Sequence, residues 1–172
     1  MSPQLCFFVS VAFGFVAWGL VAKRYIWPRL RVLSAVDALR PLLVLHVFRY
    51  VGLAFLIPGV VSPDLPSAFA HPAAYGDIAA ASLALLALAT LPGRAGVVIA
   101  WIFNIWGSFD LLDAFYQGNA AALVPGQLGA AYFIPTVLVP LMLITHGLAF
   151  RILLQLRSPV SGRNSPAISL PV

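Results

Sequence analysis

Five mainly apolar stretches constrain what this chain can fold into, because each is long enough, or nearly so, to cross a lipid bilayer. A membrane-spanning helix needs about 20 such residues, and the stretches occupy residues 5–22, 42–61, 77–91, 97–116 and 131–150. The composition agrees, since 62% of the 172 residues are hydrophobic and only 9% are charged. We therefore expect an all-α, polytopic membrane protein with five transmembrane helices.

The composition also excludes several classes of protein. With so little polar surface, the chain cannot be a soluble enzyme, a disordered chain or a nucleic-acid binder. Its formal net charge of +5 indicates topology first and attraction to anionic lipid head groups second. The single cysteine excludes an intrachain disulfide and a thiolate metal cluster. The expected partner is the lipid bilayer.

The distribution of Lys and Arg predicts an orientation. The connections over residues 62–76 and 117–130 contain neither residue type. In a five-helix arrangement, nine of the ten basic residues fall on the opposite side: Lys23, Arg24, Arg29, Arg31, Arg40, Arg94, Arg151, Arg157 and Arg163. The positive-inside rule makes that side cytoplasmic. We expect a multi-pass protein of a bacterial inner membrane, with its N-terminus outside and its C-terminus in the cytoplasm.

The chain is expected to form one membrane domain and a tail. Residues 1–157 would be a single helical bundle, and residues 158–172, rich in Ser and Pro, a disordered cytoplasmic tail. The basic cluster follows the first apolar stretch instead of preceding it, which predicts a retained first helix and not a signal peptide. Residues 23–40 are expected to form a short helix in the membrane interface.

The third stretch is the weakest span, because it is short and consists almost wholly of Ala and Leu. It could extend backward through residues 67–75 only as a broken or re-entrant element, since Pro63, Pro66 and Pro72 argue against a continuous helix. Asp77, which follows Gly76, is then expected to cap the N-terminus of the third helix.

Few polar residues lie within the apolar stretches, where an ionisable side chain costs several kcal/mol and normally faces protein or water. A helical rise of about 1.5 Å per residue assigns them to two depths. The cytoplasmic tier holds His46 and His146, and the tier from mid-membrane outward holds Arg49, Asn104, Asp110, Asp113 and Asp77.

Arg49 predicts an intramembrane ion pair. A guanidinium stays charged and must find acceptors, and a carboxylate one or two turns away is within its reach. We expect Arg49 to pair with Asp110 or Asp77, and Asn104 to hydrogen-bond the pair. Either the pair fixes the register of helices two, three and four, or it forms a site for an anion, a proton or a lipid head group.

The two histidines raise a haem b hypothesis. Haem in a bundle needs axial imidazoles at matched depth on facing helices, small residues beside the macrocycle and cations near the propionates. His46 and His146 satisfy the first condition if their helices face each other, and Gly52, Gly107 and Gly147 offer room. The alternative is that each histidine hydrogen-bonds a neighbouring helix.

Aromatic residues are concentrated in the fourth stretch. They could line a pocket for a quinone or another flat apolar ligand, or they could serve packing and anchoring at the interface. The residues are Trp101, Phe103, Trp106, Phe109, Phe115 and Tyr116.

The sequence contains no catalytic signature, and it has no glutamate. His71, with Asp64 and Asp77, is interpreted as a solvated loop residue and not as a metal ligand, because zinc and copper sites show tighter spacing. No metal site is predicted.

Four short stretches and one histidine carry a resemblance to known sequences: residues 46–52 (HVFRYVG), 65–77 (LPSAFAHPAAYGD), 101–111 (WIFNIWGSFDL) and 134–140 (IPTVLVP), and His146. Over residues 45–154 the chain resembles a family of small, uncharacterised multi-pass bacterial membrane proteins. The resemblance implies no activity. It implies that one constellation is formed by Arg49, Gly76, Asp77, Asn104, Asp110 and His146.

These features predict an integral membrane protein without evident catalytic activity. It would bind a small apolar or anionic ligand in its core, or act as an accessory subunit of a larger membrane complex or as a homo-oligomer. The alternative is a haem b-binding or quinone-interacting electron-transfer subunit that uses His46 and His146. A third hypothesis is a small channel or carrier whose path is the polar tier.

Overall fold

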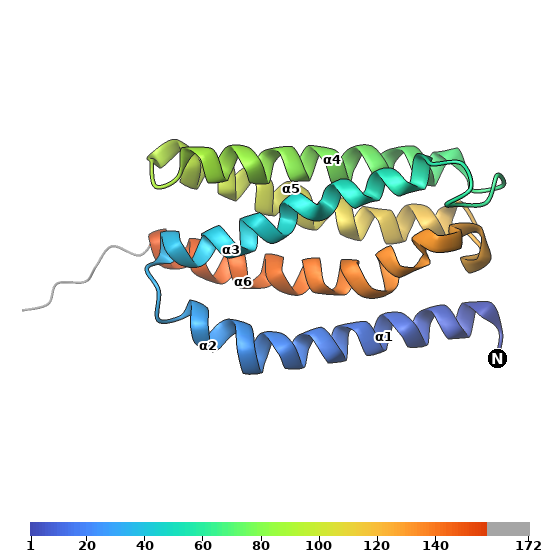
Figure 1. The fold of residues 1–172 in the computed structure, drawn as a ribbon, viewed down its shortest axis with the longest axis horizontal. Coiled ribbons are helices and arrows are strands. Elements are labelled where there is room, and N and C mark those ends of the chain that lie inside the picture. The colour runs from blue at the N-terminus through green and yellow to red at the C-terminus, as the bar shows by residue number, and fades with distance from the viewer. Residues whose placement is uncertain (158–172) are drawn as a thin grey trace, which may run out of the picture.

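The computed structural model describes residues 1–157, and the predicted tail, residues 158–172, lies outside them. Five helices of the described chain are long and apolar enough to cross a membrane: Pro3–Leu30, Ala35–Leu56, Ser67–Thr90, Arg94–Ala120 and Ile134–Leu156. They run side by side and alternate in direction along the chain (Figure 1). The predicted all-α fold with five helices of spanning length is confirmed.

The first helix is longer than predicted. α1 (Pro3–Val21) begins after Ser2, whose side chain accepts a hydrogen bond from the Leu5 amide at 3.2 Å. It continues without a break through the π-helical η1 (Ala22–Ile26) and α2 (Trp27–Leu30). The predicted interfacial helix over residues 23–40 is therefore wrong. No proline or glycine interrupts residues 20–27, and the long basic side chains at this end can reach the interface from within a span.

The second span changes its helix type in the middle of the bundle. α3 (Ala35–Val47) begins after Ser34, whose hydroxyl accepts from the Asp37 amide at 3.1 Å. The 3₁₀ helix η2 (Phe48–Leu56) follows directly. A 3₁₀ helix has three residues per turn, so every third side chain lies in one row. The buried residues of η2 form that row, Arg49, Gly52 and Phe55. The switch of helix type thus aims Arg49 at the core.

The third span is one continuous helix, α4 (Ser67–Thr90), with Pro72 inside it. The expectations of a broken element and of Asp77 as an N-cap are both wrong. Pro66 occupies the N-cap itself, and Pro72 removes only one helix hydrogen bond. In a bilayer the other backbone N–H and C=O groups find no hydrogen-bond partner outside the helix, which favours a continuous helix. Asp77 consequently lies well inside α4, where it is buried.

The remaining spans complete the bundle. α5 (Arg94–Ala120) runs antiparallel to α4, and a short 3₁₀ helix, η3 (Pro125–Tyr132), turns the chain at its end. The last span combines the π-helical η4 (Ile134–Leu138) with α6 (Val139–Arg157). α4 approaches its neighbours closely because it buries a seam of small residues: Ala73, Ala80, Ala84 and Ala87.

The core has an apolar cluster near each end of the bundle and a polar layer between them. One cluster contains Leu39, Phe103 and Leu153, and the other contains Phe55 and Leu128. Apart from Thr136, the buried polar residues come from positions between these clusters along each helix: His46, Arg49, Asp77, Asn104, Thr145 and His146. Two apolar regions therefore enclose the polar groups.

α1 lies at the edge of the bundle, alongside α6 (Figure 1). None of its residues is buried. The Tyr132 hydroxyl, 3.0 Å from Ser10 Oγ, connects it to η3. In α2, which continues the same helix, the centre of the Trp27 ring lies 4.0 Å from the Arg151 guanidinium. Most of the circumference of α1 thus remains available to lipid.

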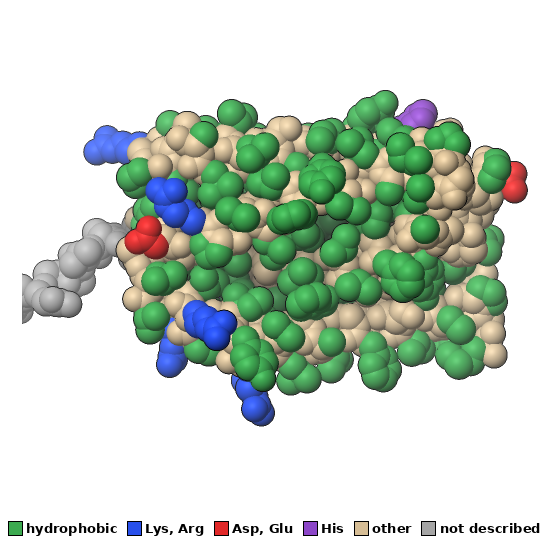
Figure 2. Space-filling view, in the orientation of Figure 1, with side chains coloured by type: hydrophobic (Ala, Val, Ile, Leu, Met, Phe, Trp, Pro, Cys, Tyr) green, Lys and Arg blue, Asp and Glu red, His purple; other side chains and the backbone are tan. Residues whose placement is uncertain are grey.

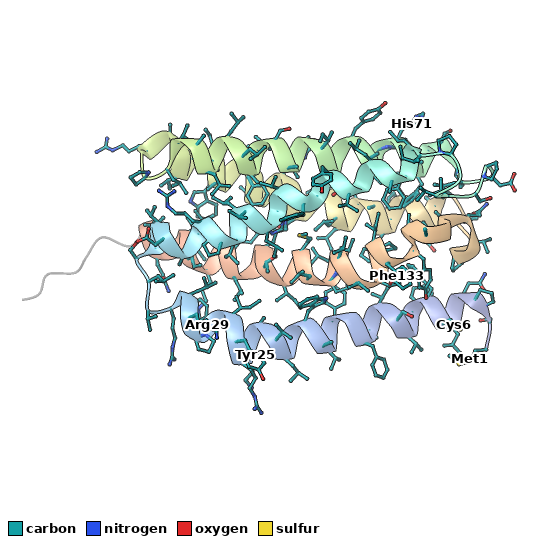
Figure 3. The ribbon with its side chains drawn as sticks, viewed as in Figure 1. Met1, Cys6, Tyr25, Arg29, His71 and Phe133 are labelled. Carbon is teal, nitrogen blue, oxygen red and sulfur yellow. The ribbon has the colours of Figure 1, made fainter. Side chains whose placement is uncertain are left out.

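The surface of the bundle suits a bilayer. Hydrophobic side chains cover the flank seen in Figure 2, and the visible Lys and Arg side chains gather toward one end. Figure 3 shows Tyr25 and Arg29 toward that end of the first helix, and Met1 and Cys6 at the opposite end. This segregation is what the distribution of basic residues in the sequence leads one to expect.

Candidate functional site

Arg49 is the centre of the polar layer and contacts three acceptors. Its Nε donates to Asp77 Oδ1 at 2.7 Å, its Nη1 donates to the Gly107 carbonyl at 3.0 Å, and its Nη2 donates to Asp110 Oδ2. Only 1% of the Arg49 side chain is exposed. The predicted ion pair is present, and it involves both carboxylates where the sequence indicated one or the other.

Two glycines leave the space that the Asp77 and Asp110 carboxylates occupy. A Cβ atom on Gly52 would overlap the Asp77 carboxylate, and a Cβ atom on Gly76 would overlap the Asp110 carboxylate. Each acid therefore occupies the space that a side chain on the neighbouring helix would fill. The resemblance included Gly76 in the constellation, and this contact gives that glycine a physical role.

A third glycine joins the ion pair to the histidines. A Cβ atom on Gly107 would lie 2.8 Å from Arg49 Nη1 and 2.8 Å from His146 Nε2. Gly107 also supplies the carbonyl that accepts from Arg49. Glycine at this position lets a guanidinium and an imidazole approach the α5 backbone together. The room that the sequence offered for a macrocycle is thus filled by protein side chains here.

Asn104 bonds a histidine and not the ion pair, which corrects the expectation from the sequence. Its Nδ2 donates to the His146 carbonyl at 3.3 Å, so Oδ1 is the acceptor for His146 Nδ1 at 2.7 Å. His146 therefore carries a proton on Nδ1. Asn104 fixes both the backbone and the ring of His146, and it holds α5 against α6.

His46 has a similar arrangement on the facing helix. Its Nε2 lies 3.0 Å from Thr145 Oγ1, and that hydroxyl already donates to the Leu141 carbonyl at 2.9 Å. The other ring nitrogens, His46 Nδ1 and His146 Nε2, are buried and have no hydrogen-bond partner within residues 1–157.

The two imidazole rings touch each other. Their centroids lie 4.1 Å apart, and the Phe103 ring packs against both, at 5.0 Å from His46 and 5.1 Å from His146. A haem with two axial histidines needs the iron and the macrocycle between the rings. Ring contact leaves no such space, so the arrangement does not fit the alternative hypothesis of a haem b site. Each histidine instead bonds a neighbouring residue, which was the alternative.

Asp113 and His71, which the sequence analysis considered, lie outside the cluster. The Asp113 carboxylate accepts from Gln117 Nε2 on its own helix at 3.4 Å, and neither Arg49 nor any other described basic residue pairs with it. His71 lies on α4 and not in a loop; it is exposed, with its ring centroid 6.1 Å from that of Tyr75.

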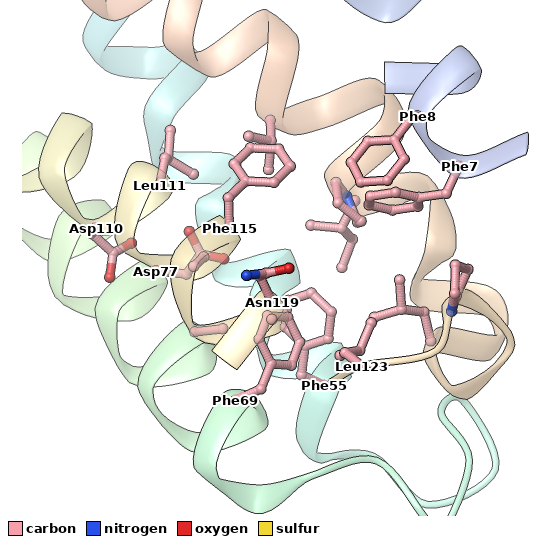
Figure 4. Close-up of a pocket in the computed structure, with 18 of the residues that line it drawn as sticks. Phe7, Phe8, Phe55, Phe69, Asp77, Asp110, Leu111, Phe115, Asn119 and Leu123 are labelled. Atoms are coloured by element: carbon pink, nitrogen blue, oxygen red, sulfur yellow. The ribbon is translucent and has the colours of Figure 1, made fainter. Parts of the chain in front are cut away.

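A cavity of about 390 Å³ adjoins the carboxylates (Figure 4). Asp77 and Asp110 line one part of it, and mostly apolar side chains line the rest. Its aromatic lining consists of Phe7, Phe8, Phe55, Phe69 and Phe115. A largely apolar cavity with a few convergent polar groups is the usual form of a small-molecule site.

The sequence did not reveal this cavity. Its five aromatic residues come from four helical elements, α1, η2, α4 and α5. Of the aromatic residues expected to form a wall on the fourth span, only Phe115 lines it. Trp106, Phe109 and Tyr116 are exposed, and Phe103 packs on the histidines. Trp101 packs near Phe150, with ring centroids 5.9 Å apart.

The cavity presents hydrogen-bond acceptors rather than a cation. Arg49 is not among its lining residues, whereas the side chains of Asp77 and Asp110 are 11% and 14% exposed and line it. Each carboxylate uses one oxygen on Arg49. The second oxygens, Asp77 Oδ2 and Asp110 Oδ1, have no hydrogen-bond partner in the described chain. This geometry favours a ligand that donates hydrogen bonds over the anionic ligand considered from the sequence.

Comparison with known proteins identifies a family. No curated protein and no solved structure matches the chain significantly. Residues 6–154 match the family described as Domain of unknown function (DUF8737). This range includes nearly all of the five helices of spanning length. The chain belongs to this uncharacterised family.

Proposed function

We propose that this protein is an integral membrane protein that binds a small amphipathic molecule in the cavity beside Asp77 and Asp110. The apolar part of the ligand would lie among the phenylalanine rings and its polar end at the carboxylates. The observation that carries the proposal is the cavity of about 390 Å³, apolar over most of its lining and ending on two carboxylates with free oxygens. Its volume lies within the range of about 300–1,000 Å³ that is usual for ligand sites.

α1 is the wall through which such a ligand could enter from the bilayer. It contributes Gln4, Phe7 and Phe8 to the cavity lining, and it buries none of its own residues. A helix with so few buried contacts is a wall that can move at low cost in free energy. An apolar ligand dissolved in the membrane would therefore reach the cavity without crossing water.

The orientation proposed here puts the cavity on the outer side of a bacterial inner membrane. Gln4 in the first turn of α1 and Asn119 in the last turn of α5 line it, near the end that holds the N-terminus (Figure 1). The visible basic side chains gather toward the opposite end (Figure 2). Under the positive-inside rule the basic end is cytoplasmic. The ligand would then come from the outer leaflet or from the space outside the membrane.

The other functions considered from the sequence have less support. A haem site lacks space between the touching rings of His46 and His146. A channel needs a pore that continues through the membrane, whereas this polar layer is enclosed by packed apolar clusters on both sides. A role as an accessory subunit or a homo-oligomer stays a prediction, because nothing in the described chain favours a particular partner.

Photolabelling tests the proposal. Purified protein is irradiated with diazirine-bearing decanol and, in parallel, with diazirine-bearing decylamine, and the labelled peptides are identified by mass spectrometry. We expect saturable labelling of peptides that contain Phe69 or Phe115 with at least one probe. Ala73→Phe, which fills the cavity from α4, should abolish it. Ala89→Phe is the matched control, since Ala89 is exposed on the same helix.

The proposal fails if neither probe labels saturably. It also fails if the labels are spread over the outward-facing surfaces of the helices and Ala73→Phe changes nothing.

A further inference from the structure

The polar end of the cavity carries more negative than positive formal charge. With both carboxyl groups ionised, Arg49 contributes one positive charge and Asp77 and Asp110 contribute two negative charges, which leaves −1. Within the described chain, the only ion pairs of these carboxylates are those with Arg49. An uncompensated charge inside a membrane costs several kcal/mol. The cluster therefore favours a positively charged partner in the cavity.

The two histidines do not supply that charge. His146 turns Nε2 toward Gly107 and Arg49, and a proton there would face the guanidinium. His46 lies behind His146, in contact with its ring and hydrogen-bonded to Thr145. Neither histidine lines the cavity. The other Lys and Arg residues within residues 1–157 lie outside the polar layer.

The groups that do line the cavity suit a cationic nitrogen. Asp77 is 8% exposed, lines the cavity, and keeps one oxygen free for a donor. Asp110 likewise keeps a free oxygen. A hydrogen bond between a charged nitrogen and a carboxylate is roughly twice as strong as one between neutral groups. The faces of the nearby phenylalanine rings attract a cation further.

The lining also discriminates against a zwitterionic lipid head group. It contains no Lys, Arg or His, so a phosphate next to the nitrogen would find carboxylates and no cation. The side chain of Arg49, the nearest positive charge, is only 1% exposed. A simple amine on an apolar body avoids this repulsion.

We infer that the ligand of this cavity is an amphipathic amine, an apolar chain or ring that bears a cationic nitrogen and no adjoining phosphate. The nitrogen lies between Asp77 and Asp110, and the apolar part lies among the phenylalanine rings. The inference rests on the proposed function and specifies the chemistry of its ligand.

A series of ligands with one chain and different head groups tests the inference. Decylamine, decanol and decanoate are each added as competitors of the labelling of the cavity by diazirine-bearing decylamine in detergent. We expect decylamine to compete at a concentration about tenfold lower than decanol, because a charge-assisted bond of about 1.4 kcal/mol corresponds to that factor. Decanoate should not compete.

Two variants of α5 localise the effect. Asp110→Asn keeps an oxygen for Arg49 but removes the charge. In this variant the concentrations at which decylamine and decanol compete should differ by no more than about threefold. Asp113→Asn is the matched control, since its carboxylate lies three residues further along the same helix and outside the cavity lining. It should leave the preference unchanged. The head-group series in the unaltered protein does not depend on the folding of either variant.

Each contrary result has a distinct meaning. Equal competition by decanol and decylamine, with saturable labelling, would overturn the cationic ligand and leave the proposed function intact. Stronger competition by decanoate would show an anion site. In nanodiscs, competition by phosphatidylethanolamine equal to that by decylamine would overturn the exclusion of phosphate-bearing lipids. The absence of saturable labelling by both the amine and the alcohol probes would overturn both proposals.

Discussion

Gly52 lies directly against the carboxylate of Asp77, so that a Cβ atom at position 52 would overlap that carboxylate. The contact joins η2 to α4 at the level of Arg49, which donates to the same acid. A single hydrogen atom in place of a side chain therefore allows an arginine and an aspartate to meet inside the bundle. The stability of the polar layer depends on this close approach.

We predict that Gly52→Ala destabilises the protein. The added methyl group must displace Asp77 from Arg49, and the disruption of a buried ion pair costs about 3–5 kcal/mol when one partner is lost. Thermal unfolding in detergent measures the effect. Gly147→Ala is the control, because a Cβ atom there meets nothing within 4 Å. Equal stability of the two variants would show that Gly52 is not a point of close contact.

We predict that Arg49→Ala lowers stability by a similar amount, about 3–5 kcal/mol, because two carboxylates lose their cation. Arg40→Ala should cost about 0–1 kcal/mol. Its side chain is 42% exposed, and its pair with Asp37 spans 3.8 Å. Adding Asp77→Asn and Asp110→Asn to Arg49→Ala should restore part of the loss. Unchanged unfolding of Arg49→Ala would contradict the intramembrane ion pair.

Asn104→Ala is predicted to cost about 1–3 kcal/mol, since it leaves the buried His146 Nδ1–H without an acceptor. Ser108→Ala, on the same helix, should have little effect, because Ser108 Oγ donates only to the carbonyl of its own helix at residue 104. Thermal unfolding of both variants makes the comparison. A loss of stability no greater for Asn104→Ala than for Ser108→Ala would remove Asn104 as the anchor of His146.

The proposed orientation predicts which loops a membrane-impermeant maleimide can reach. Cys6 is the only cysteine of the chain, so single-cysteine variants are made after Cys6→Ser. Asp64→Cys, between the second and third spans, should react in intact cells. Val32→Cys, between the first and second spans and 77% exposed, should react only after permeabilisation. The reverse pattern would place the basic end outside.

Hydropathy predicts the spans because the bilayer imposes the length of an apolar helix and satisfies no backbone group. For the same reason, the prolines wrongly predict a break in the third helix. The sequence around Pro72 indicates a break, yet a broken helix would leave several backbone groups unpaired, whereas the continuous α4 leaves one. The depth of polar residues follows from the helical rise, which is why Arg49 and its acids could be paired in advance.

Contacts that depend on the rotation of helices could not be predicted in this way. The predicted depth placed Asn104 in the tier of Arg49, and only the packing of α5 on α6 brings it to His146. The row of Arg49, Gly52 and Phe55 arises from a 3₁₀ helix that the sequence analysis did not predict. The cavity combines phenylalanines from distant stretches, and a reading of one helix at a time cannot bring them together.

Native mass spectrometry of the protein, extracted gently from its own membranes, tests the central claim most directly. The account predicts a bound small molecule whose composition includes nitrogen and no phosphorus. It should persist in Ala89→Phe and be absent from Ala73→Phe, because only Ala73 lines the cavity. A protein that carries no small molecule, or an adduct retained when the cavity is filled, would contradict the account.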